Sequence, residues 1–293
     1  MISTRTHRRA RLDRADGAQP GSQMPMPVVL ISFNRGAMLR QVVDEYRRQS
    51  VPVDVVVHDN GSDDPYTLDM LVQLEREGVT VVRRPRISST DELNLVDETV
   101  QEIFRSRPHS PYAVSDCDVS LGESSRDTLA ACLDLLEAMP DLECVGPMLR
   151  IDDVPTTYPL YVPLMNRHVG AFWSQEPRWV APQGRLLAFQ RAPVATTLAV
   201  YRAGSTFRHI TRGARLYPPY AARHLEWYPD ADHGRDAYRA SVDGSTISNW
   251  SNPARERANT QVELERTQFR DVQEADDGSL VAITRTVRAP KSL

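Results

Sequence analysis

The stretch that decides the fold is Tyr112-Ala113-Val114-Ser115-Asp116-Cys117-Asp118-Val119. Its first three residues have the apolar, β-favouring character of a short strand end, and two carboxylates separated by one residue follow. In an extended chain, residues two apart point the same way, so Asp116 and Asp118 are expected to face one spot. Open α/β sheets bind ligands at the carboxyl ends of their strands. Two oxygen ligands there suit Mg²⁺ or Mn²⁺ bridging a diphosphate, and a solvated acidic turn is the plain alternative.

Strand and helix patterns alternate on both sides of this stretch. Continuous apolar runs are typical of strands covered on both faces, and the predicted strands are 28–33, 53–57, 79–82, 112–114 and 142–148. Amphipathic periodicity predicts the helices 38–49, 68–76, 91–105 and 124–138. This order predicts an α/β fold, a doubly wound and mostly parallel sheet flanked by helices, with right-handed crossovers.

The regular alternation is lost after Arg150. Prolines and aromatic residues up to Gly184 follow no clear period, and 195–202 then returns to β character. Residues after Asn252 are mainly charged and predict a helix-like tail with a last strand at 280–286. The second half is therefore expected to be irregular and rich in loops.

Composition and charge exclude several classes of protein. The chain has 293 residues, 41% hydrophobic and 25% charged, which is ordinary for a globular protein. A net charge of −4 gives no sign of nucleic-acid binding, and no apolar run has the length of a transmembrane segment. Residues 1–24 are rich in arginine without an apolar core, so we interpret them as a disordered leader, not a secretory signal. Three cysteines without metal-site spacing fit reduced thiols in a cytoplasmic protein.

Four stretches together resemble a known family. In chain order they are Val28 to Arg35, Val57-His58-Asp59-Asn60-Gly61-Ser62, Ser115-Asp116-Cys117-Asp118 and Ala222-Arg223-His224-Leu225-Glu226-Trp227-Tyr228. Together they resemble GT-A-type nucleotide-sugar glycosyltransferases, the family-two-like group. The first two stretches are similar to that family's nucleotide-facing first strand and to the Asp-Asn-Gly-Ser end of its second strand. The last two are similar to its Asp-x-Asp metal motif and to its late metal-ligating histidine.

This resemblance implies a metal-dependent transfer of a sugar from a nucleoside-diphosphate donor to an acceptor hydroxyl of a saccharide or small-molecule glycoside. A UDP-sugar is the favoured donor, and GDP- or dTDP-sugars stay open. It also implies a GT-A sheet with a nucleotide-sugar-binding half at 25–150, an acceptor-binding half of the same domain at 151–250 and a C-terminal tail at 251–293.

The resemblance assigns roles to individual residues. Asp118 is expected to coordinate Mn²⁺ or Mg²⁺, His224 to complete the coordination shell, and Asp116 to contact the ribose or a metal-bound water. Arg35 or Arg86 would meet phosphate oxygens as a bidentate donor, whereas a surface arginine is the plain alternative for each. The full set of expected donor contacts is Ser32, Asn34, Arg35, Asp59, Arg86 and Asp116. Asp59 would accept a base N–H, or else form an ordinary turn with Gly61.

An inverting transfer needs a carboxylate that takes the proton of the acceptor hydroxyl. The candidates are Glu226, Asp152 and Asp153, with Asp230 a weaker one. Glu226 follows His224 by two residues, so in an extended segment the two side chains would lie on the same side. An inverting reaction is favoured, and a retaining one stays open.

Two other functions compete with this interpretation. A nucleotidyltransferase also uses a parallel sheet and acidic metal ligands, but it usually opens with a glycine-rich phosphate loop, and Gly36 is alone after the first strand. A non-catalytic sugar-nucleotide-binding partner subunit would keep the fold without the reaction. Assembly into a homo-oligomer stays open.

Overall fold

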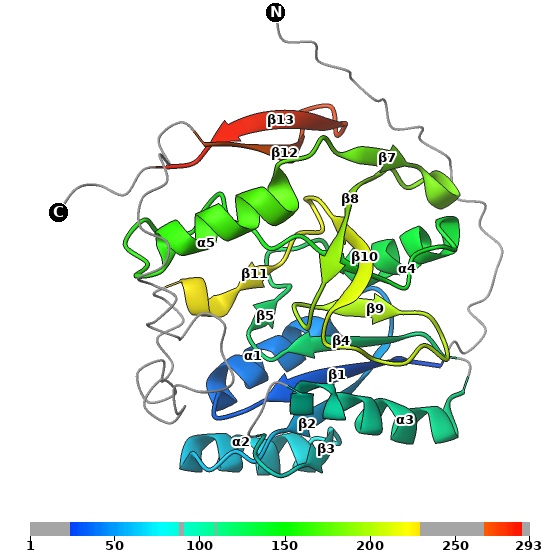
Figure 1. Cartoon of the computed structure of the whole chain (residues 1–293). Helices are drawn as coiled ribbons and strands as arrows, with labels where there is room; N and C mark the ends of the chain where they lie inside the picture. The colour runs from blue at the N-terminus through cyan, green and yellow to red at the C-terminus, as the bar shows by residue number, and fades with distance from the viewer. Residues whose placement is uncertain (1–23, 88–90, 109, 229–266, 289–293) are drawn as a thin grey trace, which may run out of the picture.

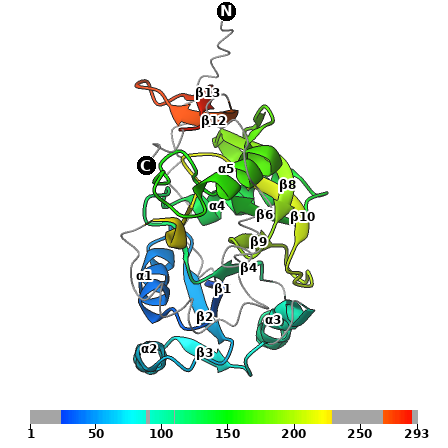
Figure 2. The ribbon, with the colours of Figure 1, turned by 60° about the vertical axis from the view of Figure 1, so that its left-hand side comes forward.

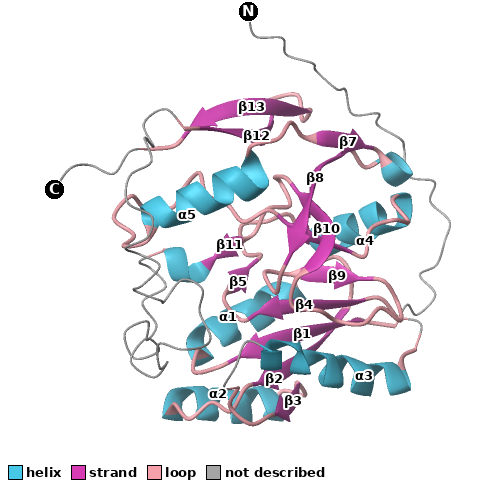
Figure 3. Ribbon diagram, viewed as in Figure 1, coloured by secondary structure: helices cyan, strands magenta, loops and turns pink. Residues whose placement is uncertain are grey.

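The computed structural model describes residues 24–87, 91–108, 110–228 and 267–288. Their main feature is a nine-stranded sheet in the order β3-β2-β1-β4-β9-β6-β10-β8-β7, with helices on its faces (Figures 1 and 3). The α/β fold expected from the sequence is confirmed. The elements of the first half are β1 (Met26–Ser32), α1 (Gly36–Arg47), β2 (Val53–Asp59), α2 (Pro65–Arg76), β3 (Thr80–Arg83), a 3₁₀ turn (Asp91–Leu95), α3 (Val96–Ser106), β4 (Tyr112–Asp116), β5 (Val119–Ser120), α4 (Thr128–Ala138) and β6 (Cys144–Pro147).

The second half contributes more strands than the sequence indicated. Its elements are α5 (Tyr161–His168), a π-helical turn (Val169–Trp173), β7 (Arg178–Val180), a 3₁₀ turn (Pro182–Gly184), β8 (Leu187–Val194), β9 (Ala199–Tyr201), β10 (Thr211–Leu216), β11 (Arg223–His224), a 3₁₀ turn (Leu225–Trp227), β12 (Gln268–Glu274) and β13 (Leu280–Thr286). The expected last strand is thus confirmed, whereas α5, β7, β8 and β10 had not been predicted.

Most strands of the large sheet point the same way, and β8 and β9 are the two that run against the others. The expectation of consecutive parallel strands fails at β9, which lies antiparallel between β4 and β6. Tyr201 of β9 pairs with Tyr112 of β4, and their rings stack at 4.9 Å with an interplanar angle of 9°. This aromatic pair helps to hold β9 in place, because cross-strand aromatic pairs are among the stronger side-chain contacts in sheets.

The charged C-terminal tail also differs from expectation where the structure describes it. Residues 268–274 form a strand, not a helix, and pair antiparallel with β13. Phe269 and Asp271 alternate inward, and Asp271 is buried because Arg285 of β13 pairs with it. The strand periodicity was missed because Asp271, a charged residue, occupies an inward position, where the partly exposed Arg285 pairs with it. The leader 1–23 and the tail residues 229–266, including Asp230, lie outside the described residues.

Alternating residues of β1 explain why helices cover both faces of the sheet. Val28 and Leu30 belong to the core cluster that α1 covers, and Val29 belongs to the cluster under α3. Figure 2 shows α1 and α3 on opposite sides of this part of the sheet. A strand buried on both faces must be apolar at every position, as the run 28–31 is.

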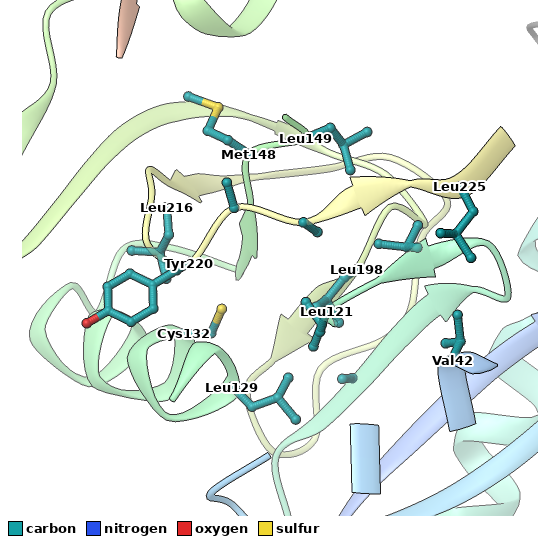
Figure 4. Close-up of a cluster of buried hydrophobic side chains, with 14 of the residues drawn as sticks. Val42, Leu121, Leu129, Cys132, Met148, Leu149, Leu198, Leu216, Tyr220 and Leu225 are labelled. Atoms are coloured by element: carbon teal, nitrogen blue, oxygen red, sulfur yellow. The ribbon is translucent and has the colours of Figure 1, made fainter. Parts of the chain in front are cut away.

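The core continues beneath the loops at the carboxyl edge of β4. Figure 4 shows Val42 of α1 and Leu129 of α4 in the same group as Leu225, which directly follows β11. These side chains come from both halves of the chain, and Leu121, Leu198 and Leu216 join them. Burial of apolar surface therefore ties the segment after β11 to the first half of the sheet.

Two neighbouring side chains hold His58 at the buried end of β2. Its Nδ1 lies 2.8 Å from Thr99 Oγ1 and its Nε2 lies 3.0 Å from Asn60 Oδ1. Burial lowers the pKa of His58 from 6.5 to about 4, and the nearby charge of Arg84 contributes to this shift.

This burial predicts a pH-dependent loss of stability on the acid side. Above pH 6.5 neither state protonates the ring, but between pH 6.5 and 4 the unfolded chain binds a proton that the folded chain does not. Stability is therefore lost as the pH falls, by at most about 3 kcal/mol from this group. Urea unfolding should show that wild type loses more free energy over this range than His58→Gln. Parallel pH profiles for the two proteins would contradict the prediction.

Candidate functional site

The candidate site lies where β1 and β4 end side by side. These strands are parallel neighbours, with Ile31 of β1 beside Asp116 of β4. Asn34 shapes the turn after β1 with a positive φ of 50°, and its Oδ1 accepts hydrogen bonds from the backbone N–H groups of Asp63 and Asp64 at 2.9 and 3.0 Å. This links the turn after β1 to the turn after β2. Arg35 follows Asn34 and stands directly before α1.

A two-residue ladder brings the second half of the chain to the same place. Cys117 and Asp118 turn the chain after β4, and β5 then pairs with β11, Val119 opposite His224. The N–H of Leu225 donates to the carbonyl of Asp118 at 2.8 Å. As a result, His224 Nδ1 lies 3.7 Å from Asp118 Oδ2.

Arg35 joins the two halves at this point. Its Nη1 donates to Oδ2 of Asp118 and its Nη2 donates to Oε2 of Glu226. The three side chains are 9%, 7% and 3% exposed, so the ion pairs are shielded from water. Although burial alone would raise the pKa of Asp118, the charges of His224 and Arg35 lower it below its usual value. Asp118 is therefore held in its anionic form.

Two buried atoms that could bind an ion have no hydrogen bond within the part of the chain that the structure describes. They are Oδ1 of Asp118 and Nδ1 of His224. The His224 ring stacks on Trp227 with centroids 4.8 Å apart and planes 3° from parallel, which fixes its orientation. Buried polar atoms without partners in native proteins call for an explanation such as an absent ion or water.

The available donors fit a divalent ion that takes its other ligands from a substrate. Mg²⁺ and similar ions are often held by one or two protein groups together with substrate phosphates. One carboxylate oxygen and one imidazole nitrogen at the site match this pattern. Within the described ranges no group of three or more His, Cys, Asp and Glu side chains is arranged to hold a metal by itself.

Asp116 has different partners from Asp118. Its Oδ2 accepts a hydrogen bond of 2.8 Å from Thr196 Oγ1, and its N–H donates to the Thr196 carbonyl at 2.7 Å. The turn at residues 117–118 ends the strand periodicity, so strand alternation does not set the directions of the two carboxylates, and their common direction stays a prediction. Burial and the nearby charge of Asp118 raise the pKa of Asp116 to about 8.

The other expected donor contacts lie along the ends of β1 and β2. Asp59 accepts from Ser62, at 3.0 Å from its N–H and 2.5 Å from its hydroxyl, as in an ordinary turn. The Ser32 hydroxyl is buried, with no hydrogen bond to any described residue. Arg86 lies nearer the surface, its guanidinium 4.9 Å from the centre of the Phe33 ring.

Asp152 and Asp153 belong to a separate charged cluster. Asp153 Oδ2 accepts 3.0 Å from Arg223 Nε, its Oδ1 accepts 2.6 Å from the Tyr228 hydroxyl, and Arg150 lies 3.2 Å away. Burial opposes ionisation, but the hydrogen bonds from Tyr228 and Arg223 lower the pKa of Asp153. Asp152 pairs with Arg150 at 3.3 Å. Neither aspartate has a contact with Arg35 or His224 among the interactions described.

Sequence reasoning missed two features of the site. It did not identify Thr196 as the partner of Asp116, since a threonine in an irregular loop carries no distinguishing pattern. It treated Arg35 as a phosphate ligand and not as the cation between Asp118 and Glu226. The position of Arg35 directly after a predicted buried strand was a usable signal, because a buried arginine needs an anionic partner.

No protein-family model and no curated protein sequence matches the chain. Among solved structures, the chain is similar to the mannosyltransferase PcManGT from Pyrobaculum calidifontis in complex with GDP-Man and Mn²⁺, at 21% identity and a TM-score of 0.35, over 48% of this chain and 40% of that one. It is also similar to S. aureus TarS, residues 1–349, at 16% identity and a TM-score of 0.33, over 43% and 36% of the two chains.

A third similar structure is the glucosyl-3-phosphoglycerate synthase from Mycobacterium tuberculosis in complex with phosphoglyceric acid. Its identity is 16% and its TM-score 0.31, over 50% of this chain and 52% of that one. The chain thus spans about two-fifths to one-half of the length of these proteins. Within the described residues, no helix has both the length and the apolar character needed to cross a membrane.

The hydrogen bond between Thr196 and Asp116 predicts a local stability effect. Thr196→Val keeps the shape of the side chain but removes the donor, so the free energy of unfolding should fall by about 1 kcal/mol. Thr80→Val, at an exposed position of β3, serves as the matched control and should change little. Equal stability of the two variants in urea unfolding would show that Thr196 does not hold Asp116.

Proposed function

We propose that the chain is a metal-dependent glycosyltransferase that moves a sugar from a nucleoside-diphosphate donor to an acceptor hydroxyl of a saccharide or small-molecule glycoside. A UDP-sugar is the favoured donor, with GDP- and dTDP-sugars as the alternatives. The observation that carries the proposal is the buried Asp118, whose Oδ1 has no hydrogen bond from a described residue and whose neighbour is the oriented His224 ring. Both lie at the sheet edge where α/β proteins bind nucleotides.

Asp118 and His224 would hold Mn²⁺ or Mg²⁺ in this reaction. The bound ion would neutralise the negative charge that develops on the leaving diphosphate. Trp227 keeps the His224 ring in one orientation, as a metal ligand requires. Asp116, partly exposed beside them, would contact the ribose or a metal-bound water.

The ends of β1 and β2 would hold the nucleotide. Ser32 and Asn34 stand at the end of β1, and Asp59 ends β2. A carboxylate oxygen accepts more than one hydrogen bond, so Asp59 retains capacity for a base N–H although Ser62 already donates to it. Arg86, at the more exposed end of this row, would meet phosphate oxygens.

Glu226 is the candidate that would take the proton of the acceptor hydroxyl, in an inverting transfer. It shares Arg35 with the candidate metal ligand Asp118, so it lies at the same charged centre. Asp153 suits this role less well, because both of its oxygens already accept hydrogen bonds and its pKa is lowered. Asp152 and Asp153 are the next candidates if Glu226 is dispensable.

Metal-dependent donor binding should depend on Asp118. Asp118→Asn removes the charge and keeps the shape, so the affinity for a UDP-sugar in the presence of Mn²⁺ should fall at least tenfold, ~1.4 kcal/mol. Asp141→Asn, an exposed aspartate paired with Arg191, is the matched control and should bind as wild type does. Titration calorimetry measures both, and unchanged affinity in Asp118→Asn would refute the assignment.

Turnover should depend on Glu226 more than donor binding does. Glu226→Gln should lower the transfer rate at least ~100-fold, because general-base catalysis contributes ~10²–10⁴-fold, while donor affinity changes less than tenfold. Asp153→Asn is the comparison variant and should keep most of the rate. Normal transfer by Glu226→Gln would move the role to Asp152 or Asp153, or indicate a retaining reaction. A wild-type protein that binds the donor but never releases free nucleoside diphosphate would indicate a non-catalytic binding subunit.

A further inference from the structure

Glu45 is a buried acidic residue on the side of α1 that faces β5. It is 5% exposed, and the fully buried Val42 and Tyr46 lie beside it on the same helix. Figure 1 shows β5 between α1 and β11. Burial of a carboxyl group is costly unless hydrogen bonds satisfy it, so the partners of Glu45 indicate its role.

Three donors share the two oxygens of Glu45. Its Oε2 accepts hydrogen bonds from the Ser120 hydroxyl at 2.7 Å and from the Leu121 N–H at 3.0 Å. Its Oε1 accepts from the side-chain amide of Gln41 at 2.9 Å, one helical turn earlier. A carboxylate is purely an acceptor, which suits a position where three donors meet. Glu45 thus holds the last residue of β5 and the residue that follows it.

The turn after β5 fits closely around this carboxyl group. A Cβ atom on Gly122 would lie 2.6 Å from Oε1 and 3.1 Å from Cδ of Glu45, so a side chain at this position would displace the carboxyl group or the turn. The Gly122 N–H also donates to the Ser120 hydroxyl oxygen at 3.1 Å. Hydrogen bonds and close packing therefore both fix the position of β5 on α1.

The position of β5 in turn determines where His224 lies. Ser120 pairs with Arg223 and Val119 pairs with His224, and this ladder has only two residue pairs. An isolated two-stranded pair is marginally stable at best, so β5 and β11 depend on contacts with the rest of the fold. The hydrogen bonds of Glu45 provide such a contact at Ser120, directly opposite β11.

We propose that Glu45 is a positioning residue for the candidate metal site, an inference that rests on the proposed function. Asp118 directly precedes β5 and His224 belongs to β11, so a fixed β5 helps to set the 3.7 Å between His224 Nδ1 and Asp118 Oδ2. Glu45 acts through Ser120 and Leu121. Because metal affinity depends on how accurately the ligands are held, loss of Glu45 should weaken metal-dependent donor binding.

The test is titration calorimetry of the full chain with UDP in the presence of Mn²⁺. Glu45→Leu removes the acceptor of Ser120 and Leu121, so the affinity should fall at least tenfold, ~1.4 kcal/mol. Glu45→Gln keeps one oxygen for these two donors and should stay within threefold of wild type. A smaller loss in Glu45→Leu overturns the inference. An equal loss in Glu45→Gln also overturns it, because the negative charge and not the hydrogen bonds would then be required.

Gln49→Leu is the matched control. Gln49 lies four residues after Glu45 and is buried, and its Oε1 accepts from the N–H of Leu129 in α4 at 3.3 Å. Its loss should lower the free energy of unfolding, as the loss of Glu45 does, but should leave the affinity within threefold of wild type. Equal losses of affinity in the two leucine variants would indicate a general effect of weakened packing and would contradict the positioning role.

A milder variant is available if Glu45→Leu does not fold. Ser120→Ala removes one of the three hydrogen bonds to Glu45 and keeps the backbone pairing of β5 with β11. Its affinity for UDP with Mn²⁺ should fall at least threefold. An affinity closer to that of wild type would show that this hydrogen bond does not position the site.

Amide hydrogen exchange separates this inference from the proposed function, because it needs no ligand. The Leu225 N–H, which donates to the Asp118 carbonyl, should exchange at least tenfold faster in Glu45→Leu than in wild type. The Asn60 N–H, at the ends of β1 and β2, should exchange as it does in wild type. Unchanged exchange at Leu225 overturns the inference. If wild type binds no UDP with Mn²⁺, the proposed function fails, and the exchange rates still decide whether Glu45 holds β5 and β11 in place.

Discussion

Two carboxylates buried at one edge of a sheet require a cation, and Arg35 provides it. Removal of one partner from a buried ion pair typically costs ~3–5 kcal/mol, because the other charge is left uncompensated. Here the three groups come from the turn after β1, the turn after β4 and the 3₁₀ turn after β11. The two ion pairs of Arg35 therefore connect three segments that are far apart in the sequence, and they link the two halves of the chain.

Aromatic packing connects this charged centre to the hydrophobic core. Trp227 is fully buried, stacks on His224 and packs in a T-shaped arrangement with the His168 ring of α5, with centroids 4.9 Å apart. The orientation of His224 is thus set by contacts that lead into the hydrophobic core. Functional side chains are held most accurately when their supports are rigid, and here those supports are a buried indole and the ends of parallel strands.

The first half of the fold could be predicted because its signals are local. A strand buried on both faces is apolar throughout, as 28–31 is, and that pattern needs no knowledge of the partner strands. The second half was predicted only in part: the β character at 195–202 and the last strand at 280–286 correspond to β9 and β13, whereas α5, β7, β8 and β10 were missed. The place of Ala199–Tyr201 between β4 and β6 has no local signal, and Asp271 of β12 is a buried carboxylate whose ion-pair partner, Arg285, lies on another strand.

The features of the candidate site also differ in whether the sequence could predict them. The positions of Asp118, His224 and Glu226 near one another agree with the order of motifs in the sequence. The direction of Asp116 depends on a turn at 117–118 and on Thr196, which strand periodicity does not register. The contacts of Arg35 with Asp118 and Glu226 form only when all three segments are assembled, so no local pattern predicts them.

The antiparallel strand β9 has a consequence for how the chain folds during synthesis. Until residues 199–201 have emerged from the ribosome, β4 presents an unpaired edge, and an open edge of buried, apolar strands is a template for wrong pairing. β6 has the same unpaired side, because β9 lies between the two. The halves therefore cannot join their strands into one sheet in the order in which they are made. β4 and β6 become part of one sheet only through this three-residue strand, and β10, which is made later, then pairs with β6 and β8.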